Sequence, residues 1–192
     1  MSGPPPAPPP DPRDELPEHL PALRAFAISL TRNVATADDL VQDTIVKAWT
    51  NFEKFTHGTN LQAWLFTIQR NTYYSSLRKG RREVADPEGI HAQGLYVNPE
   101  HDGRLAYRDF QRAFDQLSDE HREVLTLVGA SGFSCEEAAE TMGVAVGTVK
   151  SRASRARKRL ADLMGLKDGE DAYPGTDQAA VAAMGRTGMQ AA

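Results

Sequence analysis

A run of basic side chains stands out in the last third of the chain. Residues 145–160 read AVGTVKSRASRARKRL and hold six basic residues and no acidic one, although the whole chain carries a formal net charge of -4 at pH 7. Lys and Arg bind phosphate oxygens through charge-assisted hydrogen bonds, and Arg also pairs with guanine edges. The chemistry that these residues favour is therefore the binding of a polyanion such as DNA.

A second basic stretch, residues 61–82, has five basic and no acidic side chains with aromatic residues between them. Unpaired bases stack on aromatic rings while Arg and Lys follow the backbone, so this composition is typical of binding to single-stranded or melted DNA. Most aromatic residues on a helix pack in the core, and we expect this of Trp64 and Phe66. For Tyr73 and Tyr74 both roles stay open.

The elements that must position the first basic stretch are two short helices. Ser134 and Glu137 form a Ser-x-x-Glu capping box, which predicts a helix that ends at Gly143. A second helix follows, with a narrow apolar seam. That seam consists of Val149, Ala153, Ala156 and Leu160. A short helix, a turn and a basic second helix form a helix-turn-helix pattern, whereas the alternative is a solvated basic helix without a ligand.

The N-terminal half also predicts helices. Apolar spacing indicates a helix from Leu20, a second that opens at Thr36 with a capping-box pattern, and a third over about 61–79. The second would bury Leu40 and Thr44 and leave an acidic face open. That face consists of Asp39, Gln42, Asp43 and Val46. It is either a solvent-exposed surface without a partner or a docking site for a basic partner protein. Residues 80–103, rich in Gly and Pro, predict a flexible linker.

The remaining composition argues against catalysis and cofactors. No nucleophile–base pair, phosphate-binding loop or zinc-ligand spacing is found, so we expect no enzyme activity, no metal and no cofactor. The single Cys135 excludes an internal disulfide and is typical of a reducing compartment. The Pro-rich start lacks a signal-peptide pattern, and no apolar run approaches the ~18 residues of a membrane span, so we expect a cytoplasmic location without membrane attachment.

Four blocks, in order, resemble the signatures of extracytoplasmic-function sigma factors, a group of the sigma-70 family. They are DDLVQDT at 38–44, AWLFTI at 63–68, LS at 117–118 with REVL at 122–125, and GTVKSR at 147–152. The stretch GTNLQAW at 58–64 is similar to the general-stress-response subgroup called EcfG.

This resemblance implies an all-α protein of two small helical domains joined by a flexible linker. The expected parts are a disordered Pro-rich leader (1–15), a sigma region 2 domain (16–82), the linker (83–104), a sigma region 4 helix-turn-helix domain (105–164) and a disordered tail (165–192). Such a protein binds core RNA polymerase and directs it to promoter DNA, under the control of an anti-sigma factor of the NepR type.

The resemblance also implies roles for single residues. Asp39, Gln42, Asp43 and Val46 would contact the clamp helices of the largest polymerase subunit. The -10 element would be contacted by Thr59, Asn60, Arg70, Asn71, Tyr74 and Arg78. The -35 element would be contacted by Thr148, Lys150, Ser151, Arg152, Arg155, Arg157 and Lys158.

Two other classes of protein stay open. A sigma-like decoy would bind an anti-sigma protein without reading promoters, but it would need none of the basic residues of the second helix. A plain helix-turn-helix repressor would leave the acidic face and the aromatic basic stretch unexplained. If the chain is a sigma factor, Ala145 stands at the position where a helix-capping residue is usual in the family. The last helix should therefore be less stable by about 1 kcal/mol. Cys135 is expected to be a half-buried packing residue.

Overall fold

A computed structural model describes residues 11–83 and 104–166, and all regular elements among them are helical. The chain order is η1 (Pro12–Glu15), α1 (Leu16–Thr31), α2 (Val34–Thr50), η2 (Phe52–Lys54), α3 (Leu61–Glu83), α4 (Arg104–Asp115), α5 (Asp119–Leu125), η3 (Thr126–Ala130), α6 (Cys135–Met142) and α7 (Val146–Met164). The all-α fold class expected from the sequence is confirmed for these residues. Residues 1–10, most of the expected linker and the tail from 167 onward lie outside the described ranges.

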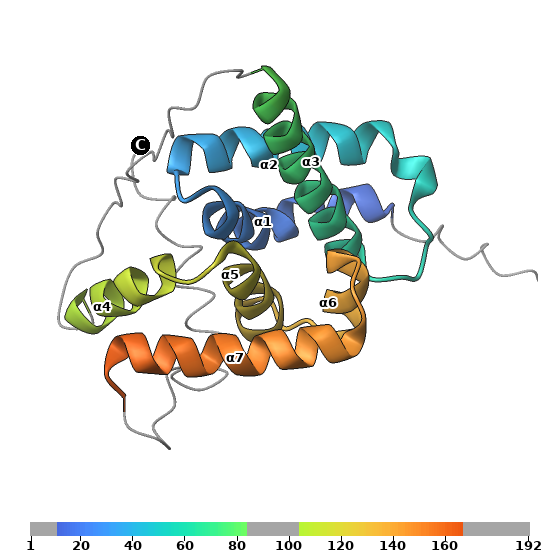
Figure 1. The fold of residues 1–192 in the computed structure, drawn as a ribbon. Coiled ribbons are helices and arrows are strands. Elements are labelled where there is room, and N and C mark those ends of the chain that lie inside the picture. The colour runs from blue at the N-terminus through green and yellow to red at the C-terminus, as the bar shows by residue number, and fades with distance from the viewer. Residues whose placement is uncertain (1–10, 84–103, 167–192) are drawn as a thin grey trace, which may run out of the picture.

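The first three long helices pack pairwise around one apolar core (Figure 1). Phe26 of α1 stacks on Phe66 of α3, with 4.7 Å between ring centroids, and both side chains are fully buried. Buried Gln69 donates from Nε2 to the carbonyl oxygen of Leu23 at 3.0 Å, which ties α3 to α1. Trp64 packs against Phe52 and Phe55, as expected for a core aromatic residue.

Three local expectations need correction in this first unit. Helix α2 begins at Val34 instead of Thr36, because Asn33 caps it by accepting from the backbone N–H of Thr36 at 3.0 Å. Helix α1 begins at Leu16, one turn before the expected start at Leu20, and Leu20 itself is 40% exposed. Residues 12–15, expected to belong to a disordered leader, form the 3-10 helix η1, which Asp11 caps.

The second unit contains the expected helix-turn-helix. Ser134 and Glu137 form the full capping box of α6, and Gly143 ends that helix with a left-handed φ of 66°, which favours glycine. Helix α7 follows at once, and its apolar seam is buried against α5 and α6, as predicted. Its N-cap Ala145 makes no side-chain capping bond, which confirms the missing cap.

The two units lie against each other. Helix α5 contacts α1, and α6 contacts α3, so the side of α3 that carries Arg70 and Tyr74 faces the second unit (Figure 1). The sequence predicted two domains joined by a flexible linker, and the structure shows the two units packed in one closed arrangement.

Candidate nucleic-acid interface

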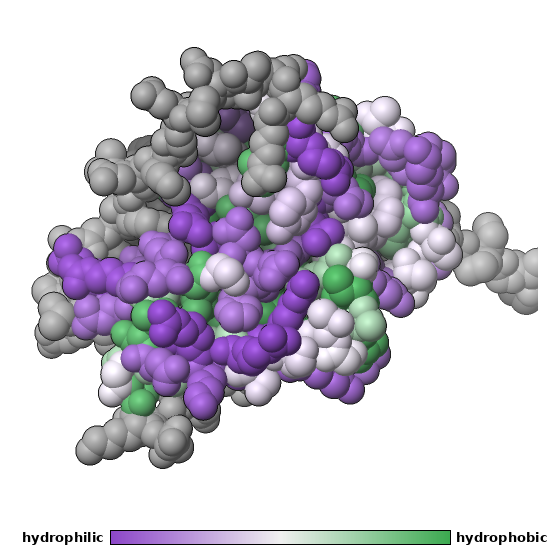
Figure 2. Space-filling model, viewed as in Figure 1, coloured by the Kyte–Doolittle hydropathy of each residue, from purple (hydrophilic) through white to green (hydrophobic). Residues whose placement is uncertain are grey.

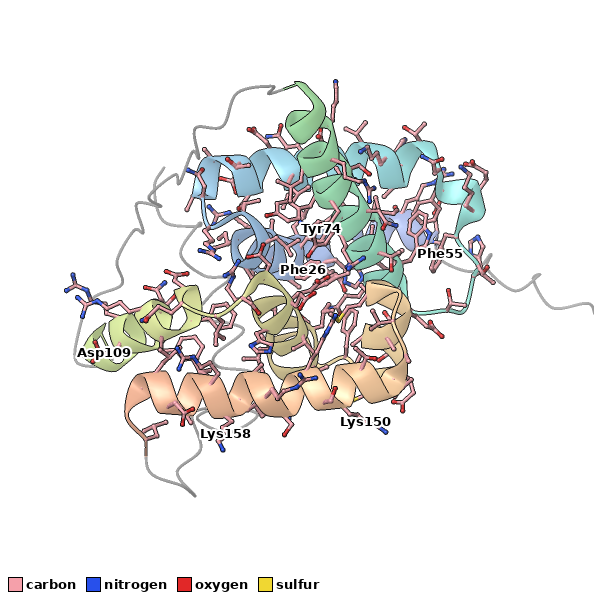
Figure 3. The ribbon with its side chains drawn as sticks, in the orientation of Figure 1. Phe26, Phe55, Tyr74, Asp109, Lys150 and Lys158 are labelled. Carbon is pink, nitrogen blue, oxygen red and sulfur yellow. The ribbon has the colours of Figure 1, made fainter. Side chains whose placement is uncertain are left out.

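The outer side of α7 carries a group of exposed cations. Five long basic side chains of this helix are exposed, and Figure 3 shows two of them, Lys150 and Lys158, projecting away from the rest of the molecule. The other three are Arg155, Arg157 and Arg159. Figure 2 shows hydrophilic side chains gathered over α4 and α7. A row of cations on an exposed helix, backed by a buried seam, can follow the phosphates of a DNA groove.

Hydrogen bonds within α7 already orient part of this face. Arg155 donates from Nε to the carbonyl oxygen of Ser151 at 3.2 Å and from Nη2 to its Oγ at 3.1 Å. Lys150 lies 3.7 Å from a carboxylate oxygen of exposed Glu136, a contact that solvent weakens.

Arg152 and Thr148 differ from the rest of the predicted -35 set because they are only partly exposed. The Arg152 side chain is 23% exposed, and its Nη2 lies 3.4 Å from Oε1 of Glu120 on α5. To reach a base, this guanidinium must therefore leave its carboxylate partner. Thr148 is half-buried on the first turn of α7.

The predicted -10 residues fall into separate groups. Arg70 and Tyr74 lie on the side of α3 that faces the second unit, where both bind Glu123 of α5. Asn60 also faces that unit, and its Nδ2 donates to Glu137 Oε1 at 2.7 Å. All three residues thus face the second unit, Asn60 at α6 and the other two at α5. Thr59 and Arg78 are exposed at opposite ends of this stretch, and Asn71 faces a different groove.

Glu123 is a residue that the sequence analysis missed. Its side chain is 1% exposed, and both of its oxygens accept, Oε1 from Arg70 Nε and Oε2 from Tyr74 OH at 3.1 Å. Burial raises the pKa of Glu123, and Arg70 acts in the opposite direction. Burial and the neighbouring Glu123 charge also raise the pKa of Tyr74, so this phenol stays protonated and donates.

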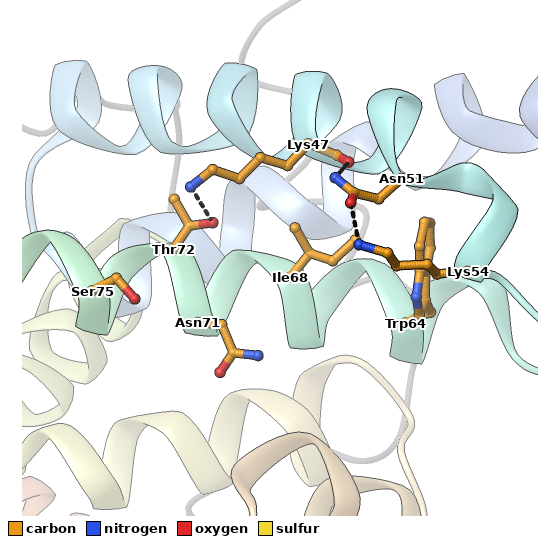
Figure 4. Close-up of a pocket in the computed structure, with 8 residues that line it drawn as sticks. All are labelled: Lys47, Asn51, Lys54, Trp64, Ile68, Asn71, Thr72 and Ser75. Atoms are coloured by element: carbon orange, nitrogen blue, oxygen red, sulfur yellow. Dashed lines mark hydrogen bonds between the residues drawn. The ribbon is translucent and has the colours of Figure 1, made fainter.

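A groove lies between α2 and α3 in the first unit. It has a volume of about 420 Å³, and Figure 4 shows its walls. Lys47 of α2 reaches across to Thr72 Oγ1 at 3.1 Å, and Lys54 Nζ lies 2.6 Å from Asn51 Oδ1. The groove is lined by Lys47, Asn51, Lys54, Trp64, Ile68, Asn71, Thr72 and Ser75.

The groove combines one aromatic face with several hydrogen-bonding groups and two ammonium groups. This combination suits a nucleobase with its phosphate, because a base stacks on Trp64 and its edge needs donors and acceptors. Of the lining residues, only Asn71 was a predicted contact. The spacing of four and then three residues between Lys47, Asn51 and Lys54 is the sequence signal that could have found these others.

The acidic face of α2 is fully formed and open. Asp39, Gln42 and Asp43 are exposed, Val46 is 64% exposed and Trp49 is 58% exposed. The opposite stripe of the helix is buried in the core. Arg13 of η1 lies over the Trp49 ring, with 5.4 Å from Cζ to the centroid. Two large apolar side chains beside acidic groups mark a protein-binding surface better than a purely solvated one.

The described residues contain no cluster of His, Cys, Asp and Glu that could hold a metal ion. Among those same residues, no helix has the length and hydrophobicity of a membrane span.

Comparisons with known proteins match both units. The family model for sigma-70 region 2 matches residues 17–83, and the model for sigma-70 region 4 matches residues 107–160. The sigma factor EcfG of Rhodopseudomonas palustris is 49% identical over 162 residues, which cover 84% of this chain and 90% of that protein. The sigma factor SigL of Mycobacterium tuberculosis is 37% identical over 150 residues, covering 74% and 82%.

Solved structures agree with this result. The sigma factor RpoE of Bartonella quintana, in complex with the anti-sigma factor NepR, matches with a TM-score of 0.73 and 50% identity over 81% of this chain and 97% of that one. The PhyRSL–NepR complex of Sphingomonas sp. Fr1 matches with a TM-score of 0.60 at 20% identity over 82% and 92%, which shows a shared fold.

Proposed function

The chain belongs to the extracytoplasmic-function sigma factors of the sigma-70 family, and we propose that it binds core RNA polymerase and directs it to promoters through both of its helical units. The observation that supports this most is the pairing of an exposed basic helix-turn-helix with an acidic and apolar face on α2. DNA and polymerase then have separate surfaces on one small chain.

In this proposal α7 reads the -35 element. The N-terminal residues of a recognition helix reach base edges, and later cations hold phosphates. Lys150, Ser151 and Arg155 are exposed on the first turns, while Arg157 and Lys158 are exposed further along. Thr148 and Arg152 complete the set once the latter leaves Glu120.

The -10 element would be bound as melted DNA along α3. The groove beside Asn71 is the proposed binding site for one unpaired base, and Lys47 and Lys54 would contact the neighbouring phosphates. Thr59 and Arg78 are free to join from the ends of the same surface, whereas Asn60, Arg70 and Tyr74 are engaged by the second unit in this structure.

The acidic face of α2 would dock polymerase. Asp39, Gln42, Asp43 and Val46 are the proposed contacts with the clamp helices of the largest subunit, and the exposed Trp49 extends that surface. Acidic groups around an apolar patch steer a basic partner and then bury the patch.

We also propose that an anti-sigma protein of the NepR type controls the chain and that the setting is the general stress response. The support is the likeness to EcfG and to RpoE, whose structure contains NepR. We expect a cytoplasmic location and no catalytic activity of its own.

Reconstitution with core polymerase tests the proposal. The protein should give transcripts from defined promoters, and a NepR-type protein should suppress them. A decoy that only binds the anti-sigma protein would bind NepR but yield no transcript. Asp43→Arg should abolish retention on immobilised core enzyme, whereas Asp109→Arg, an equal charge change on α4, should leave it intact. Equal retention of both variants would exclude the α2 face.

Arg152→Ala tests the reading of bases by α7. If this guanidinium makes a bidentate base contact, its loss should relax selectivity at one -35 position by ~1–3 kcal/mol. An equal loss at every promoter would show that it only binds phosphate.

A further inference from the structure

Helix α5 places two charged side chains inside the contact between the two units. Arg122 and Glu123 are adjacent in the sequence, and both side chains are 1% exposed. Charged residues are seldom buried so completely without specific partners. Three of their five hydrogen-bond partners lie in the first unit, so the contact between the two units is specific.

Arg122 joins α5 to the end of α1. Its Nε donates to the carbonyl oxygen of Ser29 at 2.9 Å, and its other nitrogens bind Leu117 O and Asp119 Oδ1, both at 2.7 Å. Each of the three guanidinium nitrogens therefore has a partner, and one of the three bonds crosses between the units.

Glu123 joins α5 to α3. Both carboxylate oxygens accept from α3, and the Arg70 guanidinium also lies over the Tyr74 ring at 4.7 Å. Arg70 and Tyr74 are residues proposed above for the -10 element. Figure 3 shows Tyr74 at the centre of the molecule, between α3 and α5.

Three further contacts surround this pair. Glu137 accepts from Asn60, another proposed -10 residue, at 2.7 Å. Phe133 packs on Phe66, with 5.1 Å between centroids. Arg32 and Asp119 pair across the units at 3.1 Å, with both side chains largely exposed.

The chemistry of these contacts resembles that of a bound nucleic acid. A carboxylate that accepts from an Arg and a Tyr hydroxyl uses the same donors that a phosphate oxygen would use. Two acidic residues of the second unit, Glu123 and Glu137, occupy three donors of the first. The α3 donors cannot serve Glu123 and DNA at the same time.

We infer that Glu123, supported by Glu137, is an internal competitor of promoter DNA, which holds the free protein closed and hides the α3 side of the -10 surface until the two units separate. This inference rests on the proposed function for the role of α3. The Coulomb energy gained by a buried ion pair is largely offset by the cost of desolvating its charges. The Arg70–Glu123 pair therefore makes the closed state specific without making it irreversible.

The test compares Glu123→Gln with Glu140→Gln in the full chain. Both variants remove one negative charge from the second unit, but Glu140 is exposed and lies on the outer part of α6. Dyes on Cys residues introduced at exposed positions 53 and 162, in a Cys135→Ser background, report the distance between the units by energy transfer. Fluorescence anisotropy reports binding of the free protein to a melted -10 oligonucleotide.

Glu123→Gln should lower the energy transfer and strengthen oligonucleotide binding by roughly tenfold, as expected when a minor open state of ~10% becomes dominant. Glu140→Gln should change neither by more than about twofold. Unchanged energy transfer in Glu123→Gln would overturn the inference. So would separated units that bind the oligonucleotide no better than the Glu140→Gln control.

A locked variant tests the same idea without removing the acid. Arg32→Cys with Asp119→Cys, joined by a reducible thiol cross-linker in the Cys135→Ser background, should bind the oligonucleotide at least tenfold more weakly, with recovery on reduction. Equal binding before and after reduction would overturn the competition. Failure of the wild-type protein to direct core polymerase to any promoter would instead reject the proposed function and leave the distance results standing.

Discussion

Replacing the buried Arg122 by Met should destabilise the protein more than most single changes. The side chain donates to two buried carbonyl oxygens, of Ser29 and Leu117, and to the carboxylate of Asp119. Met fills a similar volume but donates nothing. Each buried acceptor left without a donor costs about 1–3 kcal/mol, while Asp119 is exposed and can bind water.

The expected loss is therefore about 2–4 kcal/mol, because the cost at Leu117 falls inside the second unit, whereas the cost at Ser29 cannot exceed the roughly 1.4 kcal/mol that separates the closed state from a ~10% open state. Domains of this size are stable by about 5–15 kcal/mol, so the variant should fold but unfold at a clearly lower urea concentration. Arg155→Met is the control, because that exposed side chain bonds only to its own helix; it should stay within ~0.5 kcal/mol of the wild type.

Equilibrium urea unfolding, followed by circular dichroism, measures both variants. Arg122→Lys should fall between them, because one ammonium cannot reach three acceptors that surround a planar guanidinium. If Arg122→Met and Arg155→Met unfolded at the same urea concentration, the network around Arg122 would contribute no net stability, and the reasoning would be refuted.

Three further predictions follow from single sites. Ala145→Ser should supply the missing cap of α7 and stabilise the protein by about 1 kcal/mol. Calorimetry should then show an unfolding temperature about 2–4 °C higher. No rise would mean that the backbone N–H groups of the first turn already have hydrogen-bond partners. The backbone N–H of Ser134 lowers the pKa of Glu137, so this acid stabilises the fold above about pH 4.5 and its contribution is lost as the pH falls below that value. In Glu137→Gln the unfolding temperature should therefore fall less steeply as the pH is lowered below about 4.5 than in the wild type. The same pH dependence in both proteins would contradict this assignment. Trp49→Ala should weaken retention on core polymerase without a change in urea unfolding, because the ring is 58% exposed; undiminished retention would remove Trp49 from the docking face.

Much of the second unit could be predicted from the sequence because its signals are local. The Ser134 capping box, the Gly143 stop and the seam from Val149 to Leu160 each depend on residues within a few turns of one helix. All three are confirmed. The start of α2 was predicted wrongly because both Asn33 and Thr36 can cap a helix, and only the backbone decides which one does.

The closed contact between the units could not be predicted in this way. Glu123 is one of several acids in an acidic stretch, and its partner Arg70 lies 53 positions earlier. Nothing local marks it as buried, because burial here depends on how α5 meets α3. The groove beside Lys47 was missed for a similar reason, since its two walls come from different helices.

The central claim is that the two DNA-reading surfaces work together only after the closed units are drawn apart by polymerase. The most direct measurement is the energy transfer between positions 53 and 162, taken on the free protein, on the complex with core polymerase and on that complex at a promoter. High transfer in the free protein and a large drop on binding core enzyme would agree with this account. High transfer in a complex that transcribes from the promoter would contradict it.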